Sequence, residues 1–183
     1  MKSMVQAHVA LLRGLNVGGK NRMAMTDLAQ LFVEAGCTEV RTFIQSGNVI
    51  FKATDSKLNK LPALIAKNIE GRFGYKTPVV LRTVEQLGET IQHNPFLKAG
   101  AAEDSLHVYF LANAPDARRI ASLDPARSSP DAFFVRGRDV YLQMPNGMAR
   151  TKLSNAYFDS KLATISTARN WRTILKLFEL MQK

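Results

Sequence analysis

In residues 1–83 the spacing of the hydrophobic residues alternates between that of β-strands and that of α-helices. It predicts the order strand, helix, strand, strand, helix, strand. The first helix is predicted to start at Thr26, whose hydroxyl can cap the first turn, and to stop before Gly36. The turn between the second and third strands, residues 45–48, has the composition of a hairpin connection. This order is that of a ferredoxin-like sheet. The expected strands are residues 7–13, 40–44, 49–51 and 77–82, and the expected helices are residues 26–35 and 58–69.

Residues 84–183 follow a related order, without a matching repeat in the sequence. After a short helix near residues 84–91, three strands and one intervening helix are predicted, and two helices finish the chain in place of a fourth strand. We therefore predict an α+β fold of two small subdomains, 1–83 and 84–183, packed as one compact unit. The first is ferredoxin-like (βαββαβ), and the second is a related βαββ unit finished by two helices. The expected strands of the second half are residues 106–111, 132–135 and 140–144, and the expected helices are residues 115–120, 152–162 and 168–181.

The chain has a formal net charge of +10, and the excess of lysine and arginine lies in residues 1–83 and 146–183. Such an excess favours anionic partners, such as nucleotides or nucleic acid, and a solvated basic face explains the same pattern. No apolar run approaches the ~20 residues of a membrane span, and no export signal is evident. The single cysteine excludes an internal disulfide. We therefore expect a cytoplasmic protein with an anionic ligand, no membrane partner and no cofactor.

The predicted topology brings two polar loops together. Because the second strand runs parallel to the first, the loop after strand one and the turn between strands two and three should meet at one rim of the sheet. Glycines let such loops turn tightly and expose backbone N–H groups, an arrangement that anions favour. Two ordinary turns would use the same residue types. The residues singled out at this rim are Arg13, Gly14, Asn16, Gly18, Gly19, Lys20, Gln45, Ser46, Gly47 and Asn48.

Residues 14–20 fit the pattern G-x-x-x-x-G-K of a nucleotide-binding P-loop. However, Asn21 stands where a P-loop has a serine or threonine hydroxyl for magnesium. The next helix is predicted to start only at Thr26, too late for its N-terminus to hold phosphates. The order of the elements also differs from that of a parallel α/β sheet. The sequence therefore argues against a P-loop.

The start of the predicted last helix is a second candidate anion site. Thr167 is expected to cap this helix, which places Arg169, Asn170 and Trp171 in its first turn. A cation there opposes the helix dipole, and a bound anion would reverse that effect and use the free N–H groups. Trp171 fits two roles, a core anchor and a stacking surface for a ligand.

No catalytic grouping stands out in the sequence. His8, His93 and His107 are scattered, with no spacing typical of a metal site. Cys37 follows the predicted helix stop, and we interpret it as a packed thiol rather than a nucleophile. The predicted strands lack the aromatic platform of an RNA-recognition domain. We therefore assign no catalytic residue and no metal site.

Two N-terminal segments, ALLRGLNVGGKN at 10–21 and RTFIQSGNVIF at 41–51, resemble the bacterial domain-of-unknown-function family numbered 1697. The similarity continues through residues 93–96, Lys152-Leu153 and residues 167–173, and it covers essentially the whole chain. The resemblance implies a two-part α+β fold with a ferredoxin-like half. It implies no activity.

Three functional hypotheses are compatible with these observations. The first is a binding module in which the rim loops and the start of the last helix form a composite site between the halves for the phosphate of a nucleotide or nucleic acid. The second is an enzyme that acts on a small anionic substrate at the same cleft through positioning and charge stabilisation. The third is structural, with the polar motifs locking the halves together. In the first hypothesis charge comes from Arg13, Lys20 and Arg169, and directional hydrogen bonds come from Asn16, Asn48 and Asn170.

Overall fold

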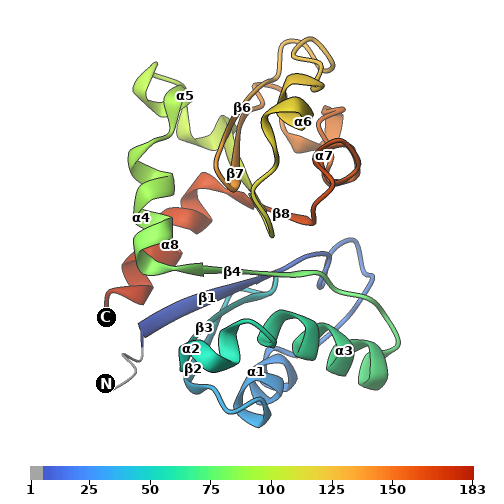
Figure 1. The fold of residues 1–183 in the computed structure, drawn as a ribbon, viewed down its shortest axis with the longest axis vertical. Helices are drawn as coiled ribbons and strands as arrows, with labels where there is room; N and C mark the ends of the chain where they lie inside the picture. The colour runs from blue at the N-terminus through green and yellow to red at the C-terminus, as the bar shows by residue number, and fades with distance from the viewer. Residues whose placement is uncertain (1–5) are drawn as a thin grey trace. The chain divides into compact units, whose positions relative to one another are not determined.

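The computed structural model describes residues 6–183, which divide into two compact units (Figure 1). The first unit comprises residues 6–87 and 177–183, and the second comprises residues 88–176. Each unit contains one four-stranded antiparallel sheet with helices, so the predicted α+β class with two subdomains is confirmed. None of the helices in residues 6–183 is long and apolar enough to cross a membrane.

The first unit has the predicted β-α-β-β-α-β order with one additional helical turn. Its sheet has the strand order β2-β3-β1-β4, and β1 is antiparallel to both β3 and β4. This is the ferredoxin-like arrangement, which is therefore confirmed. The elements are β1 (Gln6–Leu12), α1 (Met25–Glu34), β2 (Thr38–Phe43), β3 (Asn48–Ala53), α2 (Asp55–Leu58), α3 (Leu61–Phe73) and β4 (Val79–Thr83).

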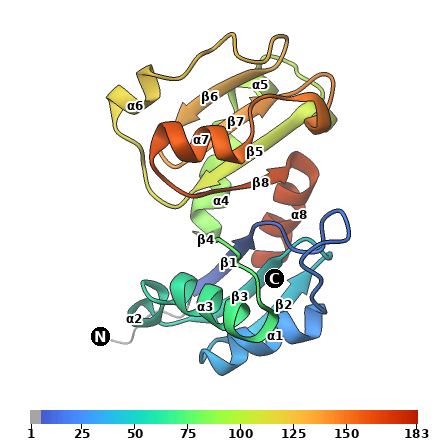
Figure 2. The same ribbon diagram turned by 90° about the vertical axis from the view of Figure 1, so that its right-hand side faces the viewer.

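Helices α1 and α3 cover one face of this sheet (Figures 1 and 2). Leu31 and Phe32 of α1 and Ile65 of α3 are fully buried against alternate residues of the strands, which is why each helix carries an apolar stripe. Phe32 and Phe51 of β3 pack with ring centroids 5.3 Å apart. Residues of β1 that point to the opposite face, such as Val9, are also fully buried. Burial on both faces explains the continuous apolar run in β1.

The second unit has a sheet of the same topology, with the strand order β6-β7-β5-β8. Its core surrounds Phe158, whose ring makes edge contacts with Tyr109, Phe133 and Tyr157. The elements of the second half of the chain are α4 (Val84–Gln92), α5 (Pro95–Lys98), β5 (Leu106–Leu111), α6 (Ala117–Ala121), β6 (Ala132–Arg136), β7 (Asp139–Gln143), α7 (Asn155–Leu162), β8 (Ser166–Asn170) and α8 (Trp171–Met181), with short 3₁₀ turns at Glu103–Ser105 and Met148–Arg150.

Strand β8 corrects the prediction for the end of the chain. Residues 168–170 were predicted to be helical with Thr167 as the N-cap, but Ser166–Asn170 pairs with β5 and forms an edge strand. Helix α8 starts at Trp171, and the Asn170 side-chain oxygen caps it by accepting from the Thr173 N–H at 2.8 Å. The segment Ser-Thr-Ala-Arg-Asn has little β-propensity of its own, and pairing with β5 supplies its backbone partners. The second unit thus completes the β-α-β-β-α-β order.

The two halves repeat each other in register. In the first sheet Val9 pairs with Arg82, and in the second Val108 pairs with Arg169. Each arginine is buried and donates to the carbonyl of the residue before it, at 2.9 Å for Arg82 and 2.7 Å for Arg169. A helix follows each strand directly, and Thr83 caps α4 as Asn170 caps α8. The repeat is therefore one of structure, with little trace in the sequence.

Candidate functional site

As predicted, the loop after β1 meets the turn between β2 and β3. The Leu12 N–H donates to the Gly47 carbonyl at 2.8 Å, and the Asn16 side-chain amide donates to the Gln45 carbonyl at 2.9 Å. These bonds join segments about thirty residues apart in the sequence. We call this region, residues 13–24 with 44–48, the rim cluster.

The glycine-rich part of the rim cluster is a small hairpin. The Lys20 N–H donates to the Val17 carbonyl at 3.0 Å, and the Asn16 N–H donates to the Asn21 carbonyl at 3.2 Å. Gly18 and Gly19 have φ angles of +58° and +75°, which is typical of a type I′ turn. The two glycines are therefore required by the turn. Because α1 begins only at Met25, the loop does not deliver phosphates to a helix N-terminus in the manner of a P-loop.

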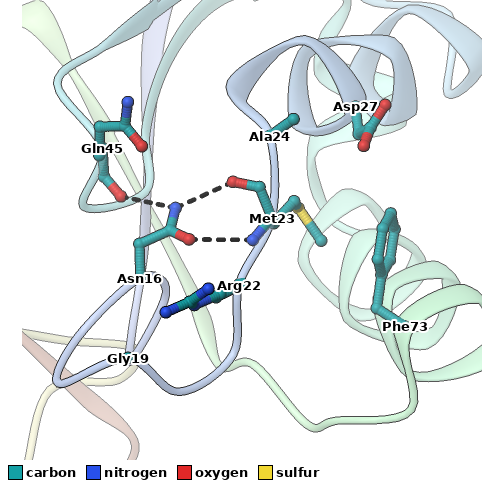
Figure 3. A pocket seen from close by; sticks show the side chains of 8 residues that line it. All are labelled: Asn16, Gly19, Arg22, Met23, Ala24, Asp27, Gln45 and Phe73. Atoms are coloured by element: carbon teal, nitrogen blue, oxygen red, sulfur yellow. Dashed lines mark hydrogen bonds between the residues drawn. The ribbon is translucent and has the colours of Figure 1, made fainter.

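Asn16 holds the rim cluster together (Figure 3). Its side-chain amide donates to the carbonyls of Met23 and Gln45 at 3.0 and 2.9 Å, and its side-chain oxygen accepts from the Met23 N–H at 2.9 Å. Its φ of +54° lies in the left-handed region, which asparagine tolerates better than most residues. Since both amide hydrogens and the oxygen are engaged, the geometry gives Asn16 a positioning role.

The other asparagines of the rim cluster also contact the backbone. The Asn21 amide donates to the Gly14 carbonyl at 3.0 Å, and the fully buried Asn48 amide donates to the Phe43 carbonyl and the Ser46 hydroxyl, both at 3.1 Å. These side chains fix the two loops to each other and to the sheet. Their predicted contacts with a ligand stay predictions.

The β2–β3 turn carries backbone strain. Ile44 has a φ of +48°, although a β-branched side chain disfavours that region, and it is 49% exposed. Strain of this kind costs about 1–3 kcal/mol and persists where the surrounding structure fixes the backbone. Here the surrounding structure is the set of bonds to Gln45, Gly47 and Asn48.

A cavity of about 480 Å³ opens at the rim cluster (Figure 3). Arg22 enters it from the loop, Gln45 from the β2–β3 turn, Asp27 from the first turn of α1 and Phe73 from the end of α3. Among residues 6–183, the Arg22 guanidinium and the Asp27 carboxylate make no ion pair or hydrogen bond. The full lining is Asn16, Gly19, Arg22, Met23, Ala24, Asp27, Gln45 and Phe73.

Sequence reasoning missed five of these eight lining residues, namely Arg22, Met23, Ala24, Asp27 and Phe73. Arg22 lies close after the glycine-rich motif, and this proximity could have identified it as a site residue. Phe73 had no local signal because it ends α3, far away in the sequence. The predicted helix cap was also wrong: the N-cap position of α1 is Ala24, with no side-chain cap, and Thr26 lies within the first turn. Asn16 fixes the backbone at Met23, so the helix starts earlier than Thr26 suggested.

The three predicted cations lie in different surroundings. Lys20 is exposed at the hairpin. Arg13 is half-buried just after β1, and its backbone N–H donates to the Pro78 carbonyl at 3.0 Å. Arg169 lies in β8 of the second unit and is 7% exposed. Its guanidinium donates to the Thr167 hydroxyl at 3.0 Å and to the Ala168 carbonyl at 2.7 Å. Burial lowers the pKa of Arg169 to about 10, so it stays a cation at neutral pH.

The remaining residues of the second motif have structural contacts within the second unit. Thr167 accepts from Arg169, and Asn170 caps α8. Trp171 is fully buried, and its indole N–H finds no acceptor among residues 6–183. The core-anchor interpretation of Trp171 agrees with this burial.

Two of the three histidines, His8 and His93, are held by local contacts. His8 is buried, with Nδ1 donating to the Gln6 carbonyl at 2.8 Å and its ring stacked on Phe51 at 5.7 Å. The ring of His93 donates from Nδ1 to the Glu89 carbonyl at 2.8 Å. His8 and His93 are therefore each oriented by a backbone carbonyl close in the sequence, whereas the buried Nδ1 of His107 has no hydrogen-bond partner among residues 6–183.

Cys37 is expected to react slowly with thiol reagents. It is 4% exposed, and burial raises the pKa of its thiol, although the charge of Lys57 opposes this in part. Because the thiolate is the reactive form, native protein at pH 8 should react with a disulfide reagent at least about tenfold more slowly than protein unfolded in denaturant. Equal rates in the two states would contradict the packed-thiol interpretation.

Comparison with known proteins supports the fold and leaves the activity open. The family model described as "Protein of unknown function (DUF1697)" matches residues 5–141. Among solved structures, the chain is similar to the conserved bacterial protein SP0830 from Streptococcus pneumoniae, with a TM-score of 0.76 and 19% identity over 98% of this chain and 100% of that one. This similarity shows a shared fold. No curated protein matches the chain.

Proposed function

We propose that the first unit of this chain, which belongs to the DUF1697 family, binds a phosphate-bearing ligand, a nucleotide or a nucleic-acid phosphate, at the rim cluster. The observation that carries the proposal is the Arg22 guanidinium, which lines the cavity without an intramolecular partner among residues 6–183. A guanidinium that faces a cavity in this way can form two parallel hydrogen bonds to a phosphate.

The hairpin beside Arg22 offers further donors. The backbone N–H groups of Gly18 and Gly19 find no acceptor among residues 6–183, and the side chain of Lys20 is exposed at the same turn. Consecutive N–H groups in a turn with left-handed residues form a concave anion-binding surface. The rim cluster therefore combines the Arg22 guanidinium, the exposed Lys20 ammonium and backbone donors within one loop.

The far wall of the cavity suits the organic part of such a ligand. Phe73 is half-buried there and packs near Tyr75, with ring centroids 6.3 Å apart. Aromatic faces stack on nucleobases. Asp27 and Gln45 supply an acceptor and an amide for a base edge or a sugar hydroxyl. A cavity of about 480 Å³ is within the usual range for small-molecule sites.

Arg22→Ala is expected to weaken binding of ATP or tripolyphosphate by about 10- to 100-fold, because a hydrogen-bonded charge pair contributes roughly 1.5–3 kcal/mol. A thermal-shift titration measures this effect. Lys67→Ala, which removes an exposed cation from α3, is the matched control for net charge and should leave the shift unchanged.

The same titration distinguishes the two ligand classes. A shift with short single-stranded RNA that fades steeply with salt, without a shift for mononucleotides, would assign the site to nucleic acid. A shift for a mononucleotide, absent for tripolyphosphate, would place most of the affinity at Phe73. Equal shifts in wild type, Arg22→Ala and Lys67→Ala would overturn the proposal.

A second candidate is a structural role for the rim motifs, and the contacts of Asn16, Asn21 and Asn48 favour it. On this hypothesis the glycines and asparagines serve only to hold the loops. Arg13→Ala should then lower the melting temperature without changing any ligand response. Circular dichroism melts of this variant, run beside the ligand titration, separate the two candidates.

A further inference from the structure

The cavity at the rim cluster holds two opposite charges that do not neutralise each other. The Arg22 guanidinium and the Asp27 carboxylate both line it, and neither makes an ion pair or hydrogen bond among residues 6–183. Figure 3 shows Arg22 on the side of the cavity where Gly19 lies, and Asp27 on the side where Phe73 lies. A ligand that uses both charges therefore needs acceptors at one end and donors at the other.

The Arg22 end provides the donors for a phosphate. A Cβ built on Gly19 would lie 3.9 Å from Arg22 Nη2, so the guanidinium lies next to the backbone of the hairpin. The Gly19 N–H finds no acceptor among residues 6–183. A charged donor and a backbone donor thus lie at the same end of the cavity, and an anion is the group that matches both.

The Asp27 end requires donors from the ligand, because an ionised carboxylate accepts hydrogen bonds and donates none. Phe73, half-buried on this side of the lining, offers an aromatic face on which a planar base can stack. Guanine presents two adjacent donors, N1–H and the 2-amino group, that match the two oxygens of one carboxylate. Adenine and cytosine place an acceptor nitrogen beside their amino group, and uracil flanks its single N–H with carbonyls.

Resting on the proposed phosphate site, we propose that this cavity selects guanine nucleotides and that Asp27 determines the choice of base. The phosphate binds Arg22 and the Gly19 N–H. The guanine ring stacks on Phe73, and its N1–H and 2-amino group donate to the Asp27 carboxylate. Adenine in the same position would place its N1 acceptor against a negative charge, so the carboxylate rejects one base as it binds the other.

Calorimetric titration of the full chain with the four ribonucleoside triphosphates tests the base preference. GTP is expected to bind at least about tenfold more tightly than ATP, CTP or UTP, a discrimination typical of a bidentate contact to a base edge. Inosine triphosphate, which lacks the 2-amino group, should fall between GTP and ATP. Equal affinity for the four triphosphates, lowered together by Arg22→Ala, would overturn the guanine assignment and leave the phosphate site in place.

Asp27→Asn is expected to reverse a base preference rather than only weaken binding. The new amide accepts from N1–H but faces the 2-amino group with a second donor, so the affinity for GTP should fall by at least about tenfold. Xanthosine triphosphate has a carbonyl in place of that amino group, and it should bind this variant more tightly than GTP does. Asp55→Asn is the matched control, because Asp55 is also an exposed aspartate in the first turn of a helix, α2.

Both aspartates are exposed, so both variants are expected to fold. If Asp27 served only the positive end of α1, Asp27→Asn would leave the order of the triphosphates unchanged, and the proposal would be overturned. Binding of single-stranded RNA without any mononucleotide would overturn it as well. No response of the wild type to any triphosphate or to tripolyphosphate would overturn the proposed function and this inference together.

Discussion

Asn16→Ala is expected to lower the free energy of unfolding by about 4–5 kcal/mol and the melting temperature by roughly 8–20 °C. The variant loses three hydrogen bonds of 2.9–3.0 Å to Met23 and Gln45, each contributing about 1 kcal/mol. It also places alanine at a φ of +54°, which costs roughly 1–2 kcal/mol. Denaturant unfolding of the purified variant measures the change.

Asn16→Gly separates the two contributions, because glycine adopts the left-handed conformation freely and lacks the amide. If the hydrogen bonds dominate, Asn16→Gly should lose about as much stability as Asn16→Ala. A glycine variant as stable as the wild type would show that only the backbone conformation matters. The assignment of Asn16 as the residue that holds the rim cluster would then be wrong.

Gly47→Ala is expected to destabilise the protein by about 2–5 kcal/mol. Gly47 has a φ of +77°, and a Cβ there would lie 2.9 Å from the Leu12 Cβ and 3.3 Å from the Leu12 carbonyl oxygen. Backbone and Cβ atoms of a central strand cannot move aside easily, so the turn must shift. The Leu12 N–H would then lose its 2.8 Å bond to the Gly47 carbonyl, and the two loops of the rim cluster would separate.

Gly18→Ala is the matched control for this prediction. Gly18 also has a positive φ, +58°, but a Cβ there meets nothing within 4 Å. Its cost should be limited to the conformational term of roughly 1–2 kcal/mol. The difference in melting temperature between the two variants measures the contribution of the close contact between Gly47 and β1. Equal destabilisation would contradict the role of that packing contact.

The first unit shows how far a hydrophobic pattern can define a fold. The period-2 and period-3.6 segments of residues 6–83 predicted the order of its main elements, because each strand and helix there buries a regular stripe. The meeting of the two rim loops followed from topology alone, since β1 and β2 end at the same edge of the sheet. Glycines at positive φ marked the turns, because the sterics of those turns are local.

The end of the chain shows where that reasoning fails. The sequence of residues 166–170 has no hydrophobic pattern typical of a strand. Strand β8 forms because the edge of β5 is available for backbone pairing. The same limit applies to the cavity at the rim cluster. Phe73 reaches it from the end of α3, and Asp27 reaches it from α1, so no spacing in the sequence links either residue to Arg22.

By itself, therefore, the sequence determined the fold class, the ferredoxin-like order of the first unit and the loops that form its rim. The tertiary structure decided which polar groups remain available. It engaged the side chain of Asn16 with backbone partners, left the Arg22 guanidinium facing a cavity, and buried the Trp171 indole N–H without an acceptor among residues 6–183. The physical reason is that hydrophobic periodicity is a local property of the chain, whereas hydrogen-bond satisfaction depends on groups that only the folded backbone brings together.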